Sequence, residues 1–296
     1  MNGTLAAQSV VDAIALGSLY ALVALGVALI FGILGLINFA HSELIMVGAF
    51  ALLLLGDVPI YLRLLMMAVL VVVVALAMER VAFRPVRGAS PATLLITSFA
   101  LSYLLQNLAI LILGPETRSG VVSPFFGESF DLGNVVILNL DLITVIVTVA
   151  LLAALGVFLT RTRMGIQMRA AAEDFRTARL LGVRADRVIA TAFAISGLLA
   201  AVAALVVTSQ AGVVQANIGV NIVLLAFVAT ILGGMGSLGG AVLGGFLLGA
   251  VTVALQAYLP VELRPYRDAF VYGAVFLTLT FRPQGLIVTR AAKGRV

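Results

Sequence analysis

The sequence contains no cysteine, no tryptophan, one histidine and one lysine, and only 10% of its 296 residues are charged. Without cysteine, disulfide bonds, thiolate chemistry and cysteine metal sites are excluded. A single histidine also excludes a multi-histidine metal site within one chain. The only lysine, Lys293, lies in the tail, so the sequence has no G-x-x-x-x-G-K-[ST] phosphate loop. We therefore expect this chain to bind no metal and no nucleotide.

Apolar residues dominate what remains. They make up 62% of the chain, and the mean hydropathy is +1.21, far above that of an ordinary soluble domain. Apolar stretches long enough to cross a hydrocarbon core of about 30 Å, which takes about 20 helical residues, recur along nearly the whole chain. The sequence predicts an all-α polytopic membrane protein with one transmembrane domain over 1–296.

The basic residues predict the topology. They gather in three segments, 79–90, 161–187 and 281–296, which the positive-inside rule places in the cytoplasm. No Lys or Arg precedes Arg63, so the N-terminus lacks the basic region of a cleaved signal peptide. We expect the first apolar run to be a retained span and the N-terminus to be external.

The apolar runs give the number of crossings. Spans are expected at about 64–79, 91–114, 141–160, 188–208, 221–232, 240–258 and 268–281. The first run, 9–56, would be about 72 Å long as one helix, which is two crossings with a break between them. The break falls at 37–43, and the total is eight or nine transmembrane helices, some of them broken or short.

The predicted break holds four polar residues, Asn38, His41, Ser42 and Glu43. A carboxylate at bilayer depth costs roughly 2.5–3.5 kcal/mol on insertion scales, so we expect Glu43 to face protein or water. The cluster has three interpretations: it hydrogen-bonds the backbone freed by the break, lines a substrate pathway, or couples transport to protons. A second polar stripe is formed by Ser98, Ser102 and Gln106, which are four residues apart and are expected to point into the bundle. These side chains either hydrogen-bond a neighbouring helix or line a pathway.

Glycines interrupt a second apolar region. The segment 232–250 contains Gly233, Gly234, Gly236, Gly239 and Gly240 among its glycines. They indicate either close helix packing or a broken helix. Short or Gly-interrupted segments in both halves of a membrane protein are a pointer to a transporter's translocation site.

The segment 161–187 is too polar to cross the membrane. Its apolar residues Met168, Ala171, Ala172, Phe175 and Ala178 fall at helical spacing, and Gly182 is a predicted helix stop. The helix either lies on an anionic inner leaflet or docks against a cytoplasmic partner.

Five stretches together carry a resemblance to a known family: "LIFGILGLINFAHSELIMVGAF", "LLQNLAILILGPE", the run "RTRMGIQMRAAAEDFRTARLLGVRADRVIATAFAISGLLAAVAALV", "ILGGMGSLGGAVLGG" and "FRPQGL". The sequence resembles the permease subunits of bacterial ABC importers for branched-chain amino acids, the LivH type. The resemblance implies an inner-membrane transport subunit that works by alternating access and is not itself an enzyme.

The resemblance also implies partners: a second permease, two cytoplasmic ATPases that bind ATP and Mg, and an external solute-binding protein. It makes 161–187 the coupling element on which the ATPase acts, with Ala172, Glu173, Ala178 and Gly182 at matching positions and Phe175 beside them.

Departures from the family pattern leave the solute open. Ser42 and Ala204 each occupy a position where family members usually have glycine. The segment "AGVVQANIGVNI" lacks a proline that family members commonly have there. Relatives that import urea, short amides or aromatic acids share the framework. Two other classes stay open: a proton-coupled secondary transporter that uses His41 and Glu43, and an intramembrane hydrolase, for which the lone histidine is weak support.

Overall fold

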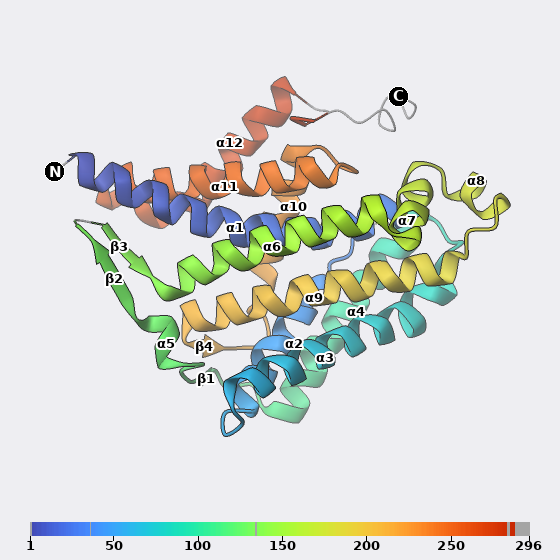
Figure 1. The fold of residues 1–296 in the computed structure, drawn as a ribbon, viewed down its shortest axis with the longest axis horizontal. Helices are drawn as coiled ribbons and strands as arrows, with labels where there is room; N and C mark the ends of the chain where they lie inside the picture. Colours follow the sequence, from blue (N-terminus) through green and yellow to red (C-terminus); the bar gives the residue numbers. More distant parts are fainter. Residues whose placement is uncertain (1, 36, 134, 283–284, 288–296) are drawn as a thin grey trace.

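The computed structural model describes residues 2–35, 37–133, 135–282 and 285–287. Figure 1 shows a bundle of helices with short strands at one end. The helices are α1 (Asn2–Leu34), α2 (His41–Leu54), α3 (Ile60–Met78), α4 (Pro91–Leu113), α5 (Pro124–Gly127), α6 (Asn139–Arg161), α7 (Arg163–Glu173), α8 (Phe175–Leu180), α9 (Ala185–Ala211), α10 (Val220–Gly233), α11 (Leu238–Tyr258) and α12 (Arg267–Phe281). The strands are β1 (Arg118–Ser119), β2 (Ser129–Leu132), β3 (Val135–Leu138) and β4 (Val213–Val214).

The predicted membrane architecture is confirmed. Within the described residues, six helices are long and apolar enough to span a bilayer: α1, α3 with its extension to Val86, α4, α6, α9 and α11. The apolar helices α2 and α10 are shorter, as expected for broken spans. The predicted eight or nine crossings thus correspond to six full-length helices, these two, and the 15-residue α12.

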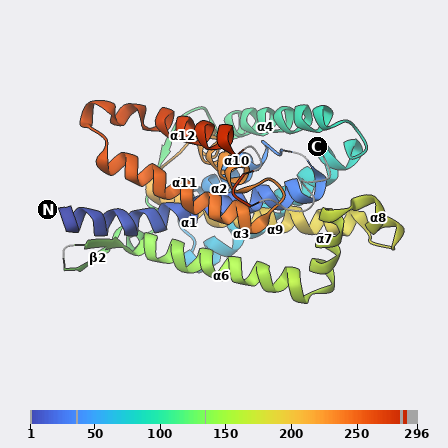
Figure 2. The same cartoon turned by 90° about the horizontal axis from the view of Figure 1, so that it is seen from above.

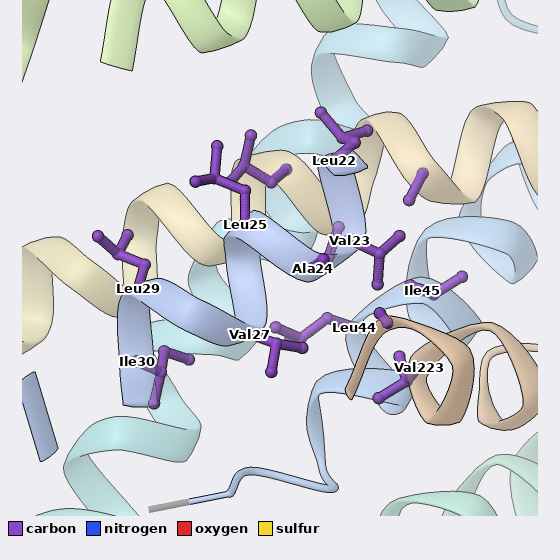
Figure 3. Close-up of a cluster of buried hydrophobic side chains, with 14 of the residues drawn as sticks. Leu22, Val23, Ala24, Leu25, Val27, Leu29, Ile30, Leu44, Ile45 and Val223 are labelled. Atoms are coloured by element: carbon purple, nitrogen blue, oxygen red, sulfur yellow. The ribbon is translucent and has the colours of Figure 1, made fainter. Parts of the chain in front are cut away.

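Helix α1 forms the centre of the bundle, with α6 on one side and α10 and α11 on the other (Figure 2). Its side chains Val23 and Val27 lie on the side of α2 and α10, near Leu44 and Val223 (Figure 3). Against α11 the contact is made by backbone. A Cβ added at Gly245 would lie 2.4 Å from Ala21, a separation that only glycine permits.

The end of the bundle opposite the basic segments carries the short strands, and we assign it to the external side. Strands β1 and β4 pair antiparallel, and β2 and β3 form an antiparallel hairpin. Arg63, at the start of α3, is 8% exposed and donates to the carbonyl oxygens of Val122 (2.9 Å), Val58 (3.2 Å) and Gly56. Its guanidinium therefore anchors the external segment after α4 to the α2–α3 turn.

The basic segments 79–90 and 161–187 meet at the other end of the bundle. Arg84 pairs with Asp186, and Arg87 pairs with both Asp186 and Glu79. These ion pairs join the turn after α3 to the start of α9. The third basic segment, 281–296, lies mostly outside the described residues.

Candidate functional site

The first helix break separates α1 from α2. Helix α1 ends at Leu34, Gly35 has a φ of +67°, and α2 begins at His41. The predicted interruption is confirmed but lies earlier than 37–43, because His41, Ser42 and Glu43 form the first turn of α2. Their backbone N–H groups donate to the carbonyls three residues earlier, at 3.2–3.3 Å.

Glu43 joins this break to α4. Its side chain is fully buried, and Oε1 accepts hydrogen bonds from Ser42 Oγ (2.8 Å), Ser102 Oγ (2.7 Å) and Gln106 Nε2 (2.8 Å). Its other oxygen, Oε2, has no partner among the described residues. Two residues of the predicted stripe on α4 thus converge on one carboxylate oxygen.

Ser98, the third residue of that stripe, holds the nonhelical backbone itself. Its Oγ lies 3.3 Å from the Ile37 carbonyl oxygen and accepts the Phe39 N–H at 3.4 Å. The Phe39 ring stacks on Phe99 of α4, with centroids 4.1 Å apart, and contacts Phe227 of α10 at 4.9 Å. The stripe therefore makes the interhelical hydrogen bonds that its spacing predicted.

His41 points away from Glu43. Its ring is fully buried, and Nδ1 lies 3.1 Å from Ser196 Oγ of α9, which in turn donates to the Gly26 carbonyl of α1 at 3.1 Å. Asn38 is 2% exposed, and neither atom of its amide has a hydrogen-bond partner among the described residues. No hydrogen bond in the described structure joins His41 to Glu43, so a direct proton relay between them has no geometric support.

The second break separates α10 from α11 and is made of glycine. Gly234 and Gly236 have φ values of +110° and +91°, which favour glycine. A Cβ at Gly233 would lie 1.9 Å from the Gly240 carbonyl oxygen, and one at Gly240 would lie 2.4 Å from that of Gly233. The predicted packing role is wrong for Gly239, because an added Cβ there would meet nothing within 4 Å.

Both breaks border one cavity of about 910 Å³ at the end of the bundle where the basic segments meet. Leu34 and Gly35 line it from the first break, and Met235 and Gly236 line it from the second. The segment predicted to couple to an ATPase lines it through Ala172, Glu173, Asp174 and Phe175. Arg84 and Arg87 also line it; the sequence marked them only as topology signals, although two arginines three apart share a face. The cavity therefore connects the predicted coupling element to both breaks.

The predicted coupling segment, 161–187, contains two helices, α7 and α8, and not the single helix that was predicted. Asp174 ends α7 and caps α8, and its carboxylate accepts from the backbone N–H of Arg176 (3.0 Å) and Thr177 (3.1 Å). Hydrogen bonds from Thr177 hold the pKa of Asp174 below its usual value. Gly182 has a φ of +88°, which confirms the predicted helix stop.

The side-chain exposure in this segment also differs from what a docking role for Ala178 predicts. Ala178 is 4% exposed and belongs to the chain's own core, so a partner cannot contact it. Leu180 and Leu181, at the tip of α8, are 82% and 81% exposed. Sequence reasoning did not single out this leucine pair, which ends an otherwise basic segment.

Comparison with known proteins settles the family. A sequence profile described as "Branched-chain amino acid transport system / permease component" matches residues 9–280. This chain belongs to that family. It is 36% identical to the high-affinity branched-chain amino acid transport system permease protein BraD of Pseudomonas aeruginosa, over 95% of both chains. It is 36% identical to LivH of Escherichia coli, over 95% of this chain and 94% of that one.

More distant relatives also align along the length of this permease. The probable branched-chain amino acid transport permease protein LivH of Methanocaldococcus jannaschii is 28% identical over 93% of this chain and 90% of that one. The solved structure "PsaBC from Streptococcus pneumoniae in complex with Fab" superposes with a TM-score of 0.48 at 15% identity, covering 95% and 92% of the two chains. The family match and the six helices long enough to span a bilayer make this chain an integral membrane transport component.

Proposed function

We propose that this permease forms part of the membrane pathway of an ATP-driven importer for branched-chain amino acids in the bacterial inner membrane. The observation that carries the proposal is the family match over nearly the whole chain, including both broken helices. The pathway residues are Asn38, His41, Ser42 and Glu43 with Ser98, Ser102 and Gln106. The unpaired atoms of Asn38 and Glu43 support this assignment, since buried polar atoms are normally paired.

The proposed complex contains a second permease, two cytoplasmic ATPases and an external solute-binding protein. ATP and Mg are bound by the ATPases, which supply the chemistry of hydrolysis. In this chain, α7 and α8 receive the movement and pass it to the first break, which borders the same cavity as they do. Differential contacts in two states then open the pathway to one side and afterwards to the other.

The test is solute uptake into proteoliposomes that contain the complete transporter. Loaded binding protein is added on the side that the permease's external face contacts. We expect leucine, isoleucine and valine to be transported only when ATP is present at the ATPases. Competition by urea, acetamide and phenylalanine defines the solute class. Accumulation of the solute driven by a proton gradient without ATP would contradict the proposal and favour a proton-coupled secondary transporter.

A further inference from the structure

Ser196, near the middle of α9, joins the two helices that flank the first break. Its Oγ lies 3.1 Å from the Gly26 carbonyl oxygen of α1 and 3.1 Å from Nδ1 of His41, the first residue of α2. Gly26 precedes the break and His41 follows it, so one hydroxyl binds both flanks of the interruption. The side chains of Ser196 and His41 are both fully buried, so bulk water does not compete for these bonds.

The donors and acceptors of this junction follow from its geometry. Serine has a single hydroxyl proton, and a carbonyl oxygen can only accept. Both bonds therefore form when Ser196 donates to Gly26 and the Nδ1–H of His41 donates to Ser196. Nε2 then carries the lone pair of a neutral imidazole, and it has no hydrogen-bond partner among the described residues. In the part of the chain that the structure describes, Ser196 is thus the only hydrogen-bond partner of the His41 ring.

The backbone of α1 restricts the same ring from another direction. A Cβ added at Gly26 would lie 3.0 Å from Cε1 and 3.1 Å from Nε2 of His41, closer than almost all real Cβ contacts. Any larger residue at this position would therefore press on the imidazole. The place of His41 is thus set by packing against α1 and by one hydrogen bond to α9.

Helix α9 is a rigid support for the Ser196 hydroxyl. Gly197, the next residue, lies so close to α3 that an added Cβ would be 2.9 Å from the Ala75 Cβ. A Cβ added at Gly48 of α2 would lie 2.6 Å from the Ala204 Cβ of α9. Helices packed this closely resist small displacements. Ser196 therefore gives a fixed point to a break in which residues 37–40 are not helical.

We propose that Ser196 is a positioning residue for transport, because it binds both flanks of the first break and so sets the place of the first turn of α2. This inference rests on the proposed function, which puts Glu43 of that turn in the pathway. His41 and Glu43 are two residues apart in one helical turn. A shift of the ring therefore moves the carboxylate relative to the Ser102 hydroxyl of α4, which is 2.7 Å from it. Ser196 acts through His41 and touches no solute.

Substitution of the serine compares its effect on uptake with its effect on stability. Ser196→Ala removes the hydroxyl and little volume, so we expect ATP-driven leucine uptake to fall about fivefold, the worth of one hydrogen bond, with little change in melting temperature. Ser196→Cys keeps a weak donor and should give intermediate uptake. The matched control is Ser18→Ala, since Ser18 is also fully buried but donates within its own helix, to Ile14. Full uptake by Ser196→Ala, equal losses in the two alanine variants, or a loss of stability in proportion to uptake overturns the proposal.

A second variant displaces the ring while the serine stays in place. Gly26→Ala presses on Cε1 and Nε2 of His41, although alanine is the better helix former. We expect uptake to fall in this variant as well. Gly156→Ala in α6 is the control, because a Cβ added there meets nothing within 4 Å. Equal uptake by the two variants would mean that the position of the ring does not matter, and the proposal would be wrong.

The junction can also be observed directly, because His41 is the only histidine of the chain. We expect magnetic resonance of the full-length permease in nanodiscs, with isotope-labelled histidine and no histidine tag, to show one imidazole with a protonated Nδ1. Ser196→Ala should shift this signal, and Ser18→Ala should not. Identical spectra for the two variants overturn the proposal. A bare Nδ1 does so too, because Ser196 would then donate to the ring and hold only one flank.

The two kinds of measurement separate this inference from the proposed function. The imidazole spectrum requires no transported solute, whereas uptake by the unsubstituted transporter tests the proposed function itself. ATP-driven leucine uptake that is indifferent to the Ser196 hydroxyl removes only the positioning role. Absence of leucine uptake in the unsubstituted transporter removes the proposed function, and with it the role of Ser196 in transport.

Discussion

The two helix breaks interrupt the bundle by different means. The break before α2 is held by side chains: Ser98 binds its backbone, and Glu43 joins it to α4. The break before α11 is held by backbone, since Gly233 and Gly240 approach too closely for any Cβ. Hydrogen bonds between side chains can exchange partners, whereas close-packed backbone has no alternative arrangement nearby. We therefore expect the first break to change during transport and the second to act as a fixed support.

The largest effect is expected where backbone packing is disturbed. Gly233→Leu forces a side chain into the Gly240 carbonyl, and overpacking alone costs about 1–3 kcal/mol. We expect the purified yield and the melting temperature in detergent to fall sharply. Gly239→Leu is the matched control, because the space at Gly239 is open. Similar yields for the two variants would remove the distinction between the breaks.

The next effect concerns the side-chain break. Glu43→Ala leaves the donors of Ser102 and Gln106 without their acceptor, at about 1–3 kcal/mol for each buried unsatisfied group. We expect ATP-driven uptake to fall more than the yield of folded permease. Glu43→Gln keeps an acceptor oxygen in place and serves as the control for folding. If yield and uptake fall equally in Glu43→Ala, the break has a structural role only.

A smaller, local effect is expected at the tip of α8. Replacing Leu180 and Leu181 by Ala removes the exposed apolar pair, and truncation of a central contact residue typically costs 1–2 kcal/mol or more. We expect weaker co-purification of the ATPases, about tenfold in affinity, with the permease still folded. Ala178→Trp should instead lower the stability of the permease, because Ala178 belongs to its core. Retention of the ATPases by the double variant would place the coupling contact elsewhere.

The smallest effect is expected at the cap of α8. Asp174→Asn should change little at neutral pH, since Asn is also a good N-cap, whereas Asp174→Ala loosens the helix. The pKa of Asp174 is lowered in the folded protein, so the cap is present at neutral pH and is lost as the pH falls through that lowered value. Hydrogen exchange of residues 175–180 measures this. Equal protection in the Asn and Ala variants would mean that the cap does not hold α8.

Composition and spacing predicted the membrane class, the spans and the two breaks, because these depend on local patterns. They also identified Glu43 and the stripe on α4, but not the hydrogen bonds between them, since Glu43 and Ser102 are 59 residues apart. Gly233 and Gly239 look equivalent in the sequence, and only the packing of α11 against α10 separates them. The family resemblance suggested Ala178 as a coupling residue, yet a small apolar residue also fits a chain's own interior, where Ala178 lies.

Arg63 sets an order for the assembly of the chain during synthesis. Two of its three acceptors, Gly56 and Val58, are made before it and lie in the adjoining turn. The third, Val122, is 59 residues later in the sequence, beyond α4. The α2–α3 hairpin therefore enters the bilayer with a guanidinium that is only partly satisfied until α4 has crossed. Insertion of α4, the helix least buried by its own chain, is thus the step that brings the third acceptor of Arg63 to the external end.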